Sequence, residues 1–411
     1  MIKFDRFTMD NGLRVIVHQD KTTPVVTLNI LYNVGAKDED PNLTGFAHLF
    51  EHLMFGGSIN IPKYDEPLQK VGGENNAFTN NDITNYYLSI PKENLETAFW
   101  IESDRMLDLA FSVKSLEVQR NVVIEEFNQR YLNQPYGDLW LLLRPLVYKK
   151  HPYQWATIGK DISHIENAKM EDVKAFYKKY YNPDNAIMVV AGDVELDEIK
   201  RLSQKWFGPI KRGAKIERNI PTEPEQTEAR FMKVERDVPV NAIFKVYHMC
   251  GRTDKDYHAT DLISDIMANG KSSRLYQKLV KEQQVFSSIQ AYISGDIHPG
   301  MIVFAGYLSD GVKPKDADNA LKQEINLLVN EGIEDDELQK VKNKVESVLT
   351  FSEINTLDRA MNLAYHELLG NAENANLELT KYQNVNTEDI QRIAKQILHD
   401  NNSSTLYYLK K

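Results

Sequence analysis

The sequence predicts an α+β protein built from two similar lobes, and three observations support this fold class. The chain has 411 residues, which is long for one hydrophobic core and suits two domains of roughly 200 residues each. Segments with strand periodicity and segments with helix periodicity are mixed along the first half. A stretch rich in proline and charge near residue 220 interrupts them, and the same order of elements then begins again.

Five segments of the first half have the residue types of β-strands. Arg14–His18 alternates, and Val25–Val34 is longer and rich in β-branched and aromatic residues. Asn76–Thr79 and Thr84–Ile90 flank an Asn-Asn-Asp turn, so we expect them to pair. Asn185–Ala191 is an apolar run of strand length that ends at a Gly-Asp pair.

Four segments of the first half have helical periodicity. They are Gly45–Phe55, Leu95–Leu109, Lys114–Leu132 and Met170–Tyr180. The first is strongly apolar and is followed by two glycines, which are typical of a helix end. It is therefore predicted to be a buried helix.

The stretch from Gly208 to Arg230 carries prolines and charges with little periodic apolar content, which is typical of a linker. We place the linker at 213–229, between lobes at 1–212 and 230–411. After it, Arg230–Glu235 and Asn241–Met249 read as strands and Ala259–Ala268 as a helix.

The two halves align as a duplicated unit. "TLNILYNVGAKDEDPNLTGFAHLFEHLMFGGS" corresponds to "AIFKVYHMCGRTDKDYHATDLISDIMANGKSS". With the turn before the helix two residues shorter in the second copy, His48, Glu51 and His52 correspond to Asp261, Ser264 and Asp265. The same fold position therefore accepts other residues in the second copy, which argues that the histidines are not a packing requirement of the helix.

Composition excludes several classes of function. Hydrophobic residues make up 42% of the chain and charged residues 26%, which is typical of a soluble globular protein. The net charge of −10 disfavours a nucleic-acid surface, and no apolar run is long enough to span a membrane. The one cysteine, Cys250, excludes an intrachain disulfide. The N-terminus lacks a signal-peptide core, so we expect a cytoplasmic protein, with an export signal removed beforehand as the alternative.

The helix at Gly45–Phe55 contains the word H-x-x-E-H, formed by His48, Glu51 and His52. Positions i, i+3 and i+4 share one helix face, so the three side chains point the same way. Two imidazoles one turn apart can hold zinc, and a neighbouring carboxylate can take a proton from its bound water. The alternative is a pair of histidines packed in a core helix beside a solvated glutamate.

Catalytic zinc usually takes three protein ligands, so a third ligand is needed. The helix at Lys114–Leu132 offers Glu125 and Glu126. Glu126 follows Val122 and Val123 by one turn and is expected on the apolar face, whereas Glu125 follows Asn121. We predict Glu126 as the ligand, with Glu125 as the second choice.

These motifs resemble the inverzincin metallopeptidases of the pitrilysin, insulin-degrading-enzyme and mitochondrial-processing-peptidase group, peptidase family M16. The resemblance rests on H-x-x-E-H, Gly-Gly-Glu-Asn-Asn-Ala-Phe-Thr at 72–79, Arg-Asn-Val-Val-Ile-Glu-Glu at 120–126 and "YYNPDNAIMVVAGDV" at 180–194. The chain length is similar to that of the short bacterial and mitochondrial members. The resemblance implies two homologous lobes, each a mixed or antiparallel β-sheet covered by helices, joined by the linker into a clamshell.

The resemblance also implies roles for individual residues. His48, His52 and Glu126 would bind one Zn²⁺ per chain, and Glu51 would be the general base that activates the zinc-bound water. Asn76, Ala77 and Phe78 would lie in an edge strand that binds an extended peptide by main-chain pairing, a mode that demands no particular sequence. The alternative for this strand is an ordinary hairpin.

The sequence departs from the family pattern at several positions. Gln119 stands where relatives often have a second glutamate, and with Glu125 it remains a possible neighbour of the site. Val280 and Ser287 stand where the family's second half usually has an arginine and a tyrosine that reach the substrate.

We therefore predict a zinc endopeptidase for unfolded peptides that works as a homodimer or as a heterodimer with a related chain. In the heterodimer, the partner supplies the missing pair. A non-catalytic peptide-binding or structural subunit is the alternative, and an unrelated zinc hydrolase of small molecules is a third.

Overall fold

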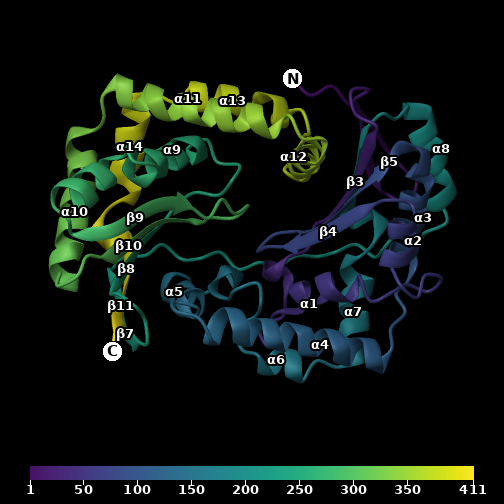
Figure 1. The fold of residues 1–411 in the computed structure, drawn as a ribbon, viewed down its shortest axis with the longest axis horizontal. Coiled ribbons are helices and arrows are strands. Elements are labelled where there is room, and N and C mark those ends of the chain that lie inside the picture. Colours follow the sequence, from purple (N-terminus) through teal and green to yellow (C-terminus); the bar gives the residue numbers. More distant parts are fainter. The chain divides into compact units, whose positions relative to one another are not determined.

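A computed structural model describes residues 1–411, and its chain forms two compact units. Unit 1 contains residues 1–128, 155–220 and 350–377, and unit 2 contains residues 129–154, 221–349 and 378–411. Each unit is a β-sheet covered by helices, so the predicted α+β class with two sheets is confirmed (Figure 1). None of the helices has the length and apolar content that a membrane span requires.

The sheet of unit 1 has six strands in the order β1-β2-β6-β3-β5-β4. Only β2 and β6 run parallel, and every other neighbouring pair is antiparallel. The strands are β1 (Asp5–Thr8), β2 (Arg14–Gln19), β3 (Val25–Tyr32), β4 (Glu74–Thr79), β5 (Thr84–Pro91) and β6 (Ala186–Gly192). The predicted pairing of the segments around the Asn-Asn-Asp turn is confirmed, because β4 and β5 form an antiparallel pair.

Eight helices belong to unit 1. They are α1 (Phe46–Leu53), α2 (Asp65–Lys70), α3 (Leu95–Leu107), α4 (Val113–Phe127), α6 (Ser163–Glu166), α7 (Met170–Tyr180), α8 (Leu196–Trp206) and α12 (Thr356–Leu368). Helices α1 and α3 contact β5, and α1 also contacts α4 and α7. On the sheet, α12 buries Ala360, Leu363 and Ala364 against apolar residues of β2, β3 and β6. One helix from late in the chain therefore covers part of the first sheet.

The sheet of unit 2 has five strands in the order β7-β11-β8-β10-β9. They are β7 (Arg230–Arg236), β8 (Ala242–His248), β9 (Phe286–Ile293), β10 (Met301–Leu308) and β11 (Ser403–Lys410). The parallel pair is β7 and β11. Reading β2, β6, β3, β5 and β4 as β7, β11, β8, β10 and β9 gives the same order and the same directions, and α1 and α9 occupy the same place in the connectivity. The predicted repetition of one unit is therefore present in the strand topology.

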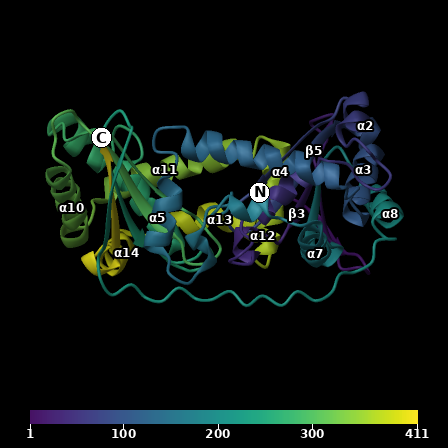
Figure 2. The same cartoon turned by 90° about the horizontal axis from the view of Figure 1, so that it is seen from below.

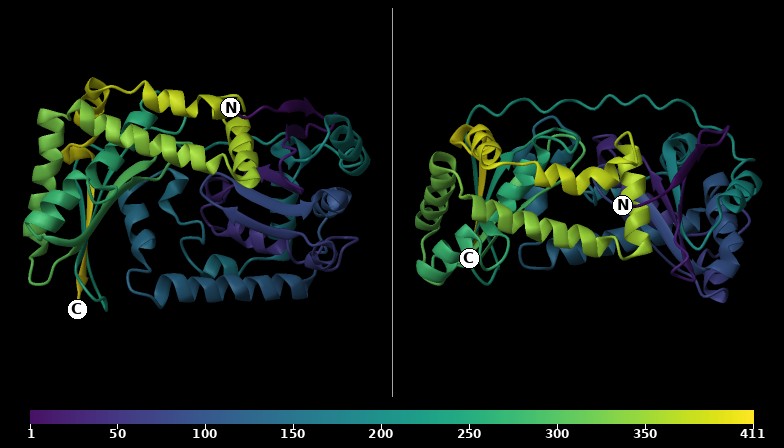
Figure 3. Two further views of the ribbon diagram at one scale, coloured as in Figure 1. Left: turned by 45° about the horizontal axis from the view of Figure 1, so that its top comes forward. Right: turned by 90° about the horizontal axis from the view of Figure 1, so that it is seen from above.

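The helices of unit 2 cover both faces of its sheet. Residues of α5 (Leu139–Val147) share one apolar cluster with Ala242, Phe244 and Val246 of β8, whereas Ile243 and Tyr247 point into the other cluster. That second cluster contains residues of α9 (Tyr257–Ala268), α10 (Pro314–Glu331), α11 (Asp335–Ser352) and α14 (Thr387–Ile397). Figure 3 shows α11 as a long yellow-green helix. The chain crosses between the units near the end of α11 and again within α13 (Asn374–Gln383).

The compact units differ from the predicted lobes at 1–212 and 230–411. Residues 129–154, which include α5, belong to unit 2, and residues 350–377, which include α12, belong to unit 1. This assignment follows from packing, because α5 buries its apolar residues on the sheet of unit 2 and α12 buries its apolar residues on the sheet of unit 1. A local sequence pattern shows that a helix has an apolar face, but it does not show which sheet the face covers.

The predicted linker has neither helix nor strand from 211 to 229, and Figure 2 shows it as an extended teal segment. Polar side chains nevertheless anchor it within each unit. In unit 1 the Arg218 guanidinium donates to Asp38 at 2.9 Å and to Asn185 at 3.1 Å. In unit 2 the Glu223 carboxylate accepts from three consecutive backbone N–H groups of residues 149–151, at 2.7, 2.8 and 2.9 Å.

Candidate metal centre

Helix α1 presents His48, Glu51 and His52 on one face. Its apolar residues are buried, whereas these three side chains are half-buried. The helix begins directly after Gly45, whose φ of +90° favours glycine. A Cβ at this position would lie 2.6 Å from the carbonyl oxygen of Ile158, so the start of the helix is packed against backbone.

A buried carboxylate caps the first turn of α1. Glu39 Oε2 accepts from the N–H of Gly45 at 2.9 Å, and Oε1 accepts from the N–H of Ala47 at 2.8 Å. Burial raises the pKa of Glu39 to about 8, although the two backbone donors act in the opposite direction. Nothing in the sequence singles out Glu39 as the capping residue, because it stands between two other acids, Asp38 and Asp40.

Helix α4 brings Glu126 to the two histidines. Glu126 Oε2 lies 3.5 Å from His48 Nε2 and 3.4 Å from His52 Nε2, and the potential ligand atoms of the three residues all lie within 4.8 Å of one another. Ligand atoms at the usual distances in a tetrahedral zinc site are about 3.3 Å apart. The spacing and the two-histidine, one-carboxylate set therefore fit zinc.

The neighbouring side chains of α4 lie outside this cluster. Glu125 is exposed, and Gln119 is half-buried two turns earlier. The reason given for preferring Glu126 was partly wrong, because Val122 is 44% exposed and only Val123 is buried.

Glu51 is half-buried beside the cluster and is not one of its three members. Burial raises the pKa of the Glu51 carboxyl, hydrogen bonds from Thr79 lower it, and the charge of Glu126 raises it again. Thr79 is the last residue of β4, so this strand ends at the acid of the H-x-x-E-H word. Thr79 belongs to the motif at 72–79, but its contact with Glu51 could not be predicted from the sequence.

Strand β4 lies at the edge of the sheet and pairs only with β5. Asn76 and Phe78 are exposed and alternate with half-buried Ala77 and Thr79. Phe78 is 37% exposed. The free edge of such a strand can pair with an added extended chain, so the role of Asn76, Ala77 and Phe78 in substrate binding stays a prediction.

The two positions that depart from the family pattern lie in unit 2. Val280 is half-buried and packs against the apolar cluster of that unit. Ser287 is exposed on β9, and its hydroxyl donates to the carbonyl oxygen of Tyr307 at 3.1 Å. Neither side chain offers a cation or a long donor.

Comparison with known proteins places the chain in a family. The model described as "Insulinase (Peptidase family M16)" matches residues 14–139, and "Peptidase M16 inactive domain" matches residues 167–345. The zinc protease PqqE of Helicobacter pylori is 30% identical over 98% of this chain and 92% of that protein. The chain belongs to peptidase family M16.

Two further comparisons agree with this assignment. An uncharacterized zinc protease of Bacillus subtilis, YmxG, is 24% identical over 97% of this chain and 96% of that protein. The crystal structure of a protease from Helicobacter pylori matches with a TM-score of 0.92 and 28% identity, over 99% of this chain and 100% of that one. Both relatives that carry a name are called zinc proteases, which supports zinc as the metal of the family.

Proposed function

We propose that this M16 member is a zinc-dependent endopeptidase for unfolded peptides and short polypeptides. His48, His52 and Glu126 hold one Zn²⁺ per chain, and Glu51 is the general base. One observation carries the proposal. Glu126 of α4 lies 3.5 Å from His48 and 3.4 Å from His52 of α1, which is close to the ligand spacing of a tetrahedral zinc site, and Glu51 is not part of this group.

The chemistry divides between the metal and the chain. When bound, zinc supplies a Lewis acid that polarises the scissile carbonyl and lowers the pKa of a water ligand to about 7. Glu51 accepts a proton from the attacking water and returns it to the leaving amine. Thr79 holds the Glu51 carboxylate through hydrogen bonds.

Strand β4 is proposed to position the substrate. An extended peptide that pairs with the main chain at Asn76, Ala77 and Phe78 would run toward Thr79 and therefore toward Glu51. Main-chain pairing orients the scissile bond without selecting one sequence, which suits a broad range of peptides.

Three glutamine variants test the catalytic assignment. Glu51→Gln is expected to keep zinc and to lose cleavage of a quenched-fluorescence peptide by about 10²-fold or more. Glu126→Gln is expected to lose zinc as well as activity, because an amide is a poorer metal ligand. Glu125→Gln is the matched control, since it changes the adjacent exposed acid, and it should keep both.

Zinc content by atomic emission and peptide cleavage are measured on the same samples. Cleavage by Glu51→Gln at the wild-type rate, or full zinc content in Glu126→Gln, would contradict the assignment.

The catalytic chain is further proposed to work in a dimer whose partner supplies an arginine and a tyrosine. The positions of Val280 and Ser287, which offer neither group, support this. Native mass and peptide cleavage are compared for the chain alone and for the chain mixed with a related chain that has the pair. Full activity from a monomer would contradict the dimer proposal while leaving the zinc assignment intact.

A second candidate function is a non-catalytic, peptide-binding subunit. The match of residues 167–345 to the inactive domain of the family is the observation that favours it. A subunit of this kind would bind peptide but not cleave it, so Glu51→Gln would have no effect on cleavage. The proposed enzyme, in contrast, loses a measurable rate of cleavage in this variant.

A further inference from the structure

Unit 1 contains a hollow of about 610 Å³ that is separate from the histidine cluster. It lies between the segment that joins α3 to α4, the C-terminal half of α7, and the chain just after α8. Its size is within the range of roughly 300–1,000 Å³ that is usual for small-ligand sites. The lining residues used below are Asp108, Phe111, Lys174, Tyr177, Lys178 and Lys211.

The rim of this hollow carries an excess of positive charge. Lys174, Lys178 and Lys211 are exposed, and none of them takes part in an ion pair. Asp108 is the one acid in the lining. Three lysines against one acid is unusual in a chain with a net charge of −10, so the hollow is a local attractor for anions.

The floor of the hollow is aromatic and rigid. The rings of Phe111 and Tyr177 meet edge to face with centroids 5.3 Å apart, and Lys174 Nζ lies 6.0 Å from the Phe111 centroid. The Tyr177 hydroxyl reaches the carbonyl oxygens of Arg105 and Met106 at 2.8 and 2.9 Å. Tyr177 is buried and is held in place before any ligand arrives.

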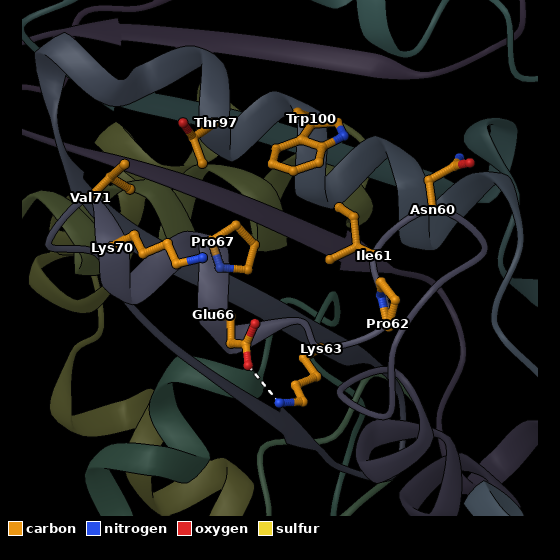
Figure 4. A pocket seen from close by; sticks show the side chains of 10 residues that line it. All are labelled: Asn60, Ile61, Pro62, Lys63, Glu66, Pro67, Lys70, Val71, Thr97 and Trp100. Carbon is orange, nitrogen blue, oxygen red and sulfur yellow. Dashed lines mark hydrogen bonds and ion pairs between the residues drawn. The ribbon is translucent and has the colours of Figure 1, made fainter.

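A second hollow of unit 1 provides a comparison and is drawn in Figure 4. It holds about 490 Å³ and has Trp100 in its wall. Lys63 is paired there with Glu66 at 2.6 Å, so Lys70 is the one lysine left without an ion pair. The lining of the first hollow therefore has two more lysines than acids, and the lining of the second hollow has one more.

We propose that the first hollow binds an aryl phosphate, with the dianionic group between the lysines and the ring on the face or edge of Phe111. Lysine ammonium groups bind phosphate as point charges, and an aromatic floor favours a ring over an aliphatic chain. The ligand is either a small aromatic phosphate ester or a phosphorylated tyrosine side chain of another protein. The proposal does not depend on the zinc chemistry.

Calorimetric titration of the full chain tests the proposal with four probes at constant ionic strength. Phenyl phosphate should bind at one site, inorganic phosphate more weakly, and phenol without measurable heat. A phosphotyrosine peptide that binds at least as tightly as phenyl phosphate assigns the site to a protein partner, whereas a peptide that binds more weakly assigns it to a small molecule.

Substitutions then locate the site. The double variant Lys174→Gln/Lys178→Gln should weaken phenyl phosphate binding at least about tenfold, because two charge-assisted contacts are lost. Lys70→Gln, in the second hollow, is the matched control and should bind like the wild type. Circular dichroism melting confirms that both variants are folded, as expected for exposed side chains.

Two results would overturn the proposal. One is the absence of phenyl phosphate binding at concentrations up to roughly 10 mM, which corresponds to a free energy of association weaker than about 3 kcal/mol. The other is unchanged binding in Lys174→Gln/Lys178→Gln, which would place the ligand elsewhere, including at the metal centre.

Discussion

At the scale of single residues, the buried Arg105 is at the centre of the contacts that stabilise the core next to α1. Its guanidinium bonds Glu102 through Nε at 2.8 Å and Nη2 at 2.7 Å, and both side chains are 1% exposed. The rings of Tyr64 and Tyr86 lie against the guanidinium at 4.6 and 4.4 Å. Tyr86 in turn places its hydroxyl 3.3 Å from the carbonyl oxygen of Phe50 in α1.

Removing one member of this buried pair is expected to be severe. Arg105→Leu leaves the buried Glu102 carboxylate with the Tyr64 hydroxyl as a donor but without a cation, so we expect a loss of about 3–5 kcal/mol in the free energy of unfolding. Urea denaturation measures the change. Arg105→Leu/Glu102→Leu should recover most of it, since an apolar pair can replace a buried ion pair.

An exposed pair serves as the control for this experiment. Lys63→Ala breaks the Lys63–Glu66 pair at the surface and should leave the denaturation midpoint unchanged. A double variant that is less stable than Arg105→Leu would contradict the interpretation.

At the scale of elements, the start of α1 is set by backbone geometry. Gly45→Ala introduces a Cβ at a φ of +90° and only 2.6 Å from the Ile158 carbonyl oxygen. The left-handed conformation alone costs about 1–2 kcal/mol for an L-residue, and the collision adds to it. We expect Gly45→Ala to lower both the free energy of unfolding and the zinc content.

Gly72→Ala is the matched control in the same unit. Its φ is +72° and the nearest atom to the new Cβ is 3.9 Å away, so it isolates the conformational strain. Equal losses of stability in the two variants, or full zinc content in Gly45→Ala, would show that the contact with Ile158 is unimportant.

A second element, α12, is held to the sheet of unit 1 by a polar contact that depends on pH. His18 Nδ1 lies 2.6 Å from the carbonyl oxygen of Lys3, and Nε2 lies 3.0 Å from Arg359 Nη1. A neutral ring with its proton on Nδ1 donates to Lys3 and accepts from Arg359, which also pairs with Asp20. A second proton on the ring would face the guanidinium.

This contact predicts lower stability in mild acid. Burial lowers the pKa of His18, the Lys3 carbonyl raises it, Arg359 lowers it and Asp20 raises it. The unfolded chain therefore binds a proton that the folded chain excludes, and the contribution of His18 to stability is lost as the pH falls below about 6.5.

His18→Gln has no group that titrates in this range, so its stability should depend less on pH. Urea denaturation between pH 7.5 and 5.5 compares it with the wild type. Parallel curves for the two proteins would contradict the prediction.

At the scale of the whole molecule, the chain repeats one topology but has the proposed zinc ligands in one copy alone. Both units have the same strand order and one parallel pair of strands. In both, a helix follows the corresponding strand: α1 follows β3, and α9 follows β8. In α9, Asp265 pairs with Lys344 at 3.3 Å, and Asp261 accepts from the Tyr382 hydroxyl at 2.6 Å. In the second copy a hydroxyl thus hydrogen-bonds the acid at the position of His48, and a lysine pairs with the acid at the position of His52.

Helix α5 comes from the first half of the chain but belongs to unit 2, and α12 comes from the second half but belongs to unit 1. A cut at the linker is therefore predicted not to yield an independently folded first lobe. A fragment of residues 1–212 lacks α12, which leaves the apolar face of β3 and β6 uncovered. We expect this fragment to aggregate or to unfold without cooperativity in a thermal melt. The same fragment joined to residues 350–377 by a flexible linker should regain a cooperative transition.

Recovery of a cooperative melt by residues 1–212 alone would contradict this view of unit 1. A fusion that carries Leu363→Asp is the control for specific packing, because Leu363 is fully buried in the cluster between α12 and the sheet.

Local patterns were enough to predict much of the fold and the centre of the site. Runs of β-branched, aromatic and apolar residues predicted β3 and β6, and helical periodicity predicted α1 and α7, with bounds close to those observed. His48, Glu51 and His52 were placed on one face because their spacing spans a single helical turn. Glu126 was selected from two adjacent acids, although half of the argument used Val122, which is exposed.

Other features depend on segments that are distant in the sequence. Three examples are the capping of α1 by Glu39, the contact of Thr79 with Glu51, and the covering of the first sheet by α12. In each case the local sequence is compatible with several partners, so it does not identify the one that is found.

The sequence by itself therefore determined β3, α1, α7 and β6 and the spacing of His48, Glu51 and His52, because each of these is encoded within a few helical turns or one strand. The repetition was visible in the sequence because the two halves can be aligned. Only the tertiary structure decided which helix covers which sheet and which acid completes the site. Apolar faces and adjacent carboxylates are chemically alike along the chain, and the packing of distant segments selects among them.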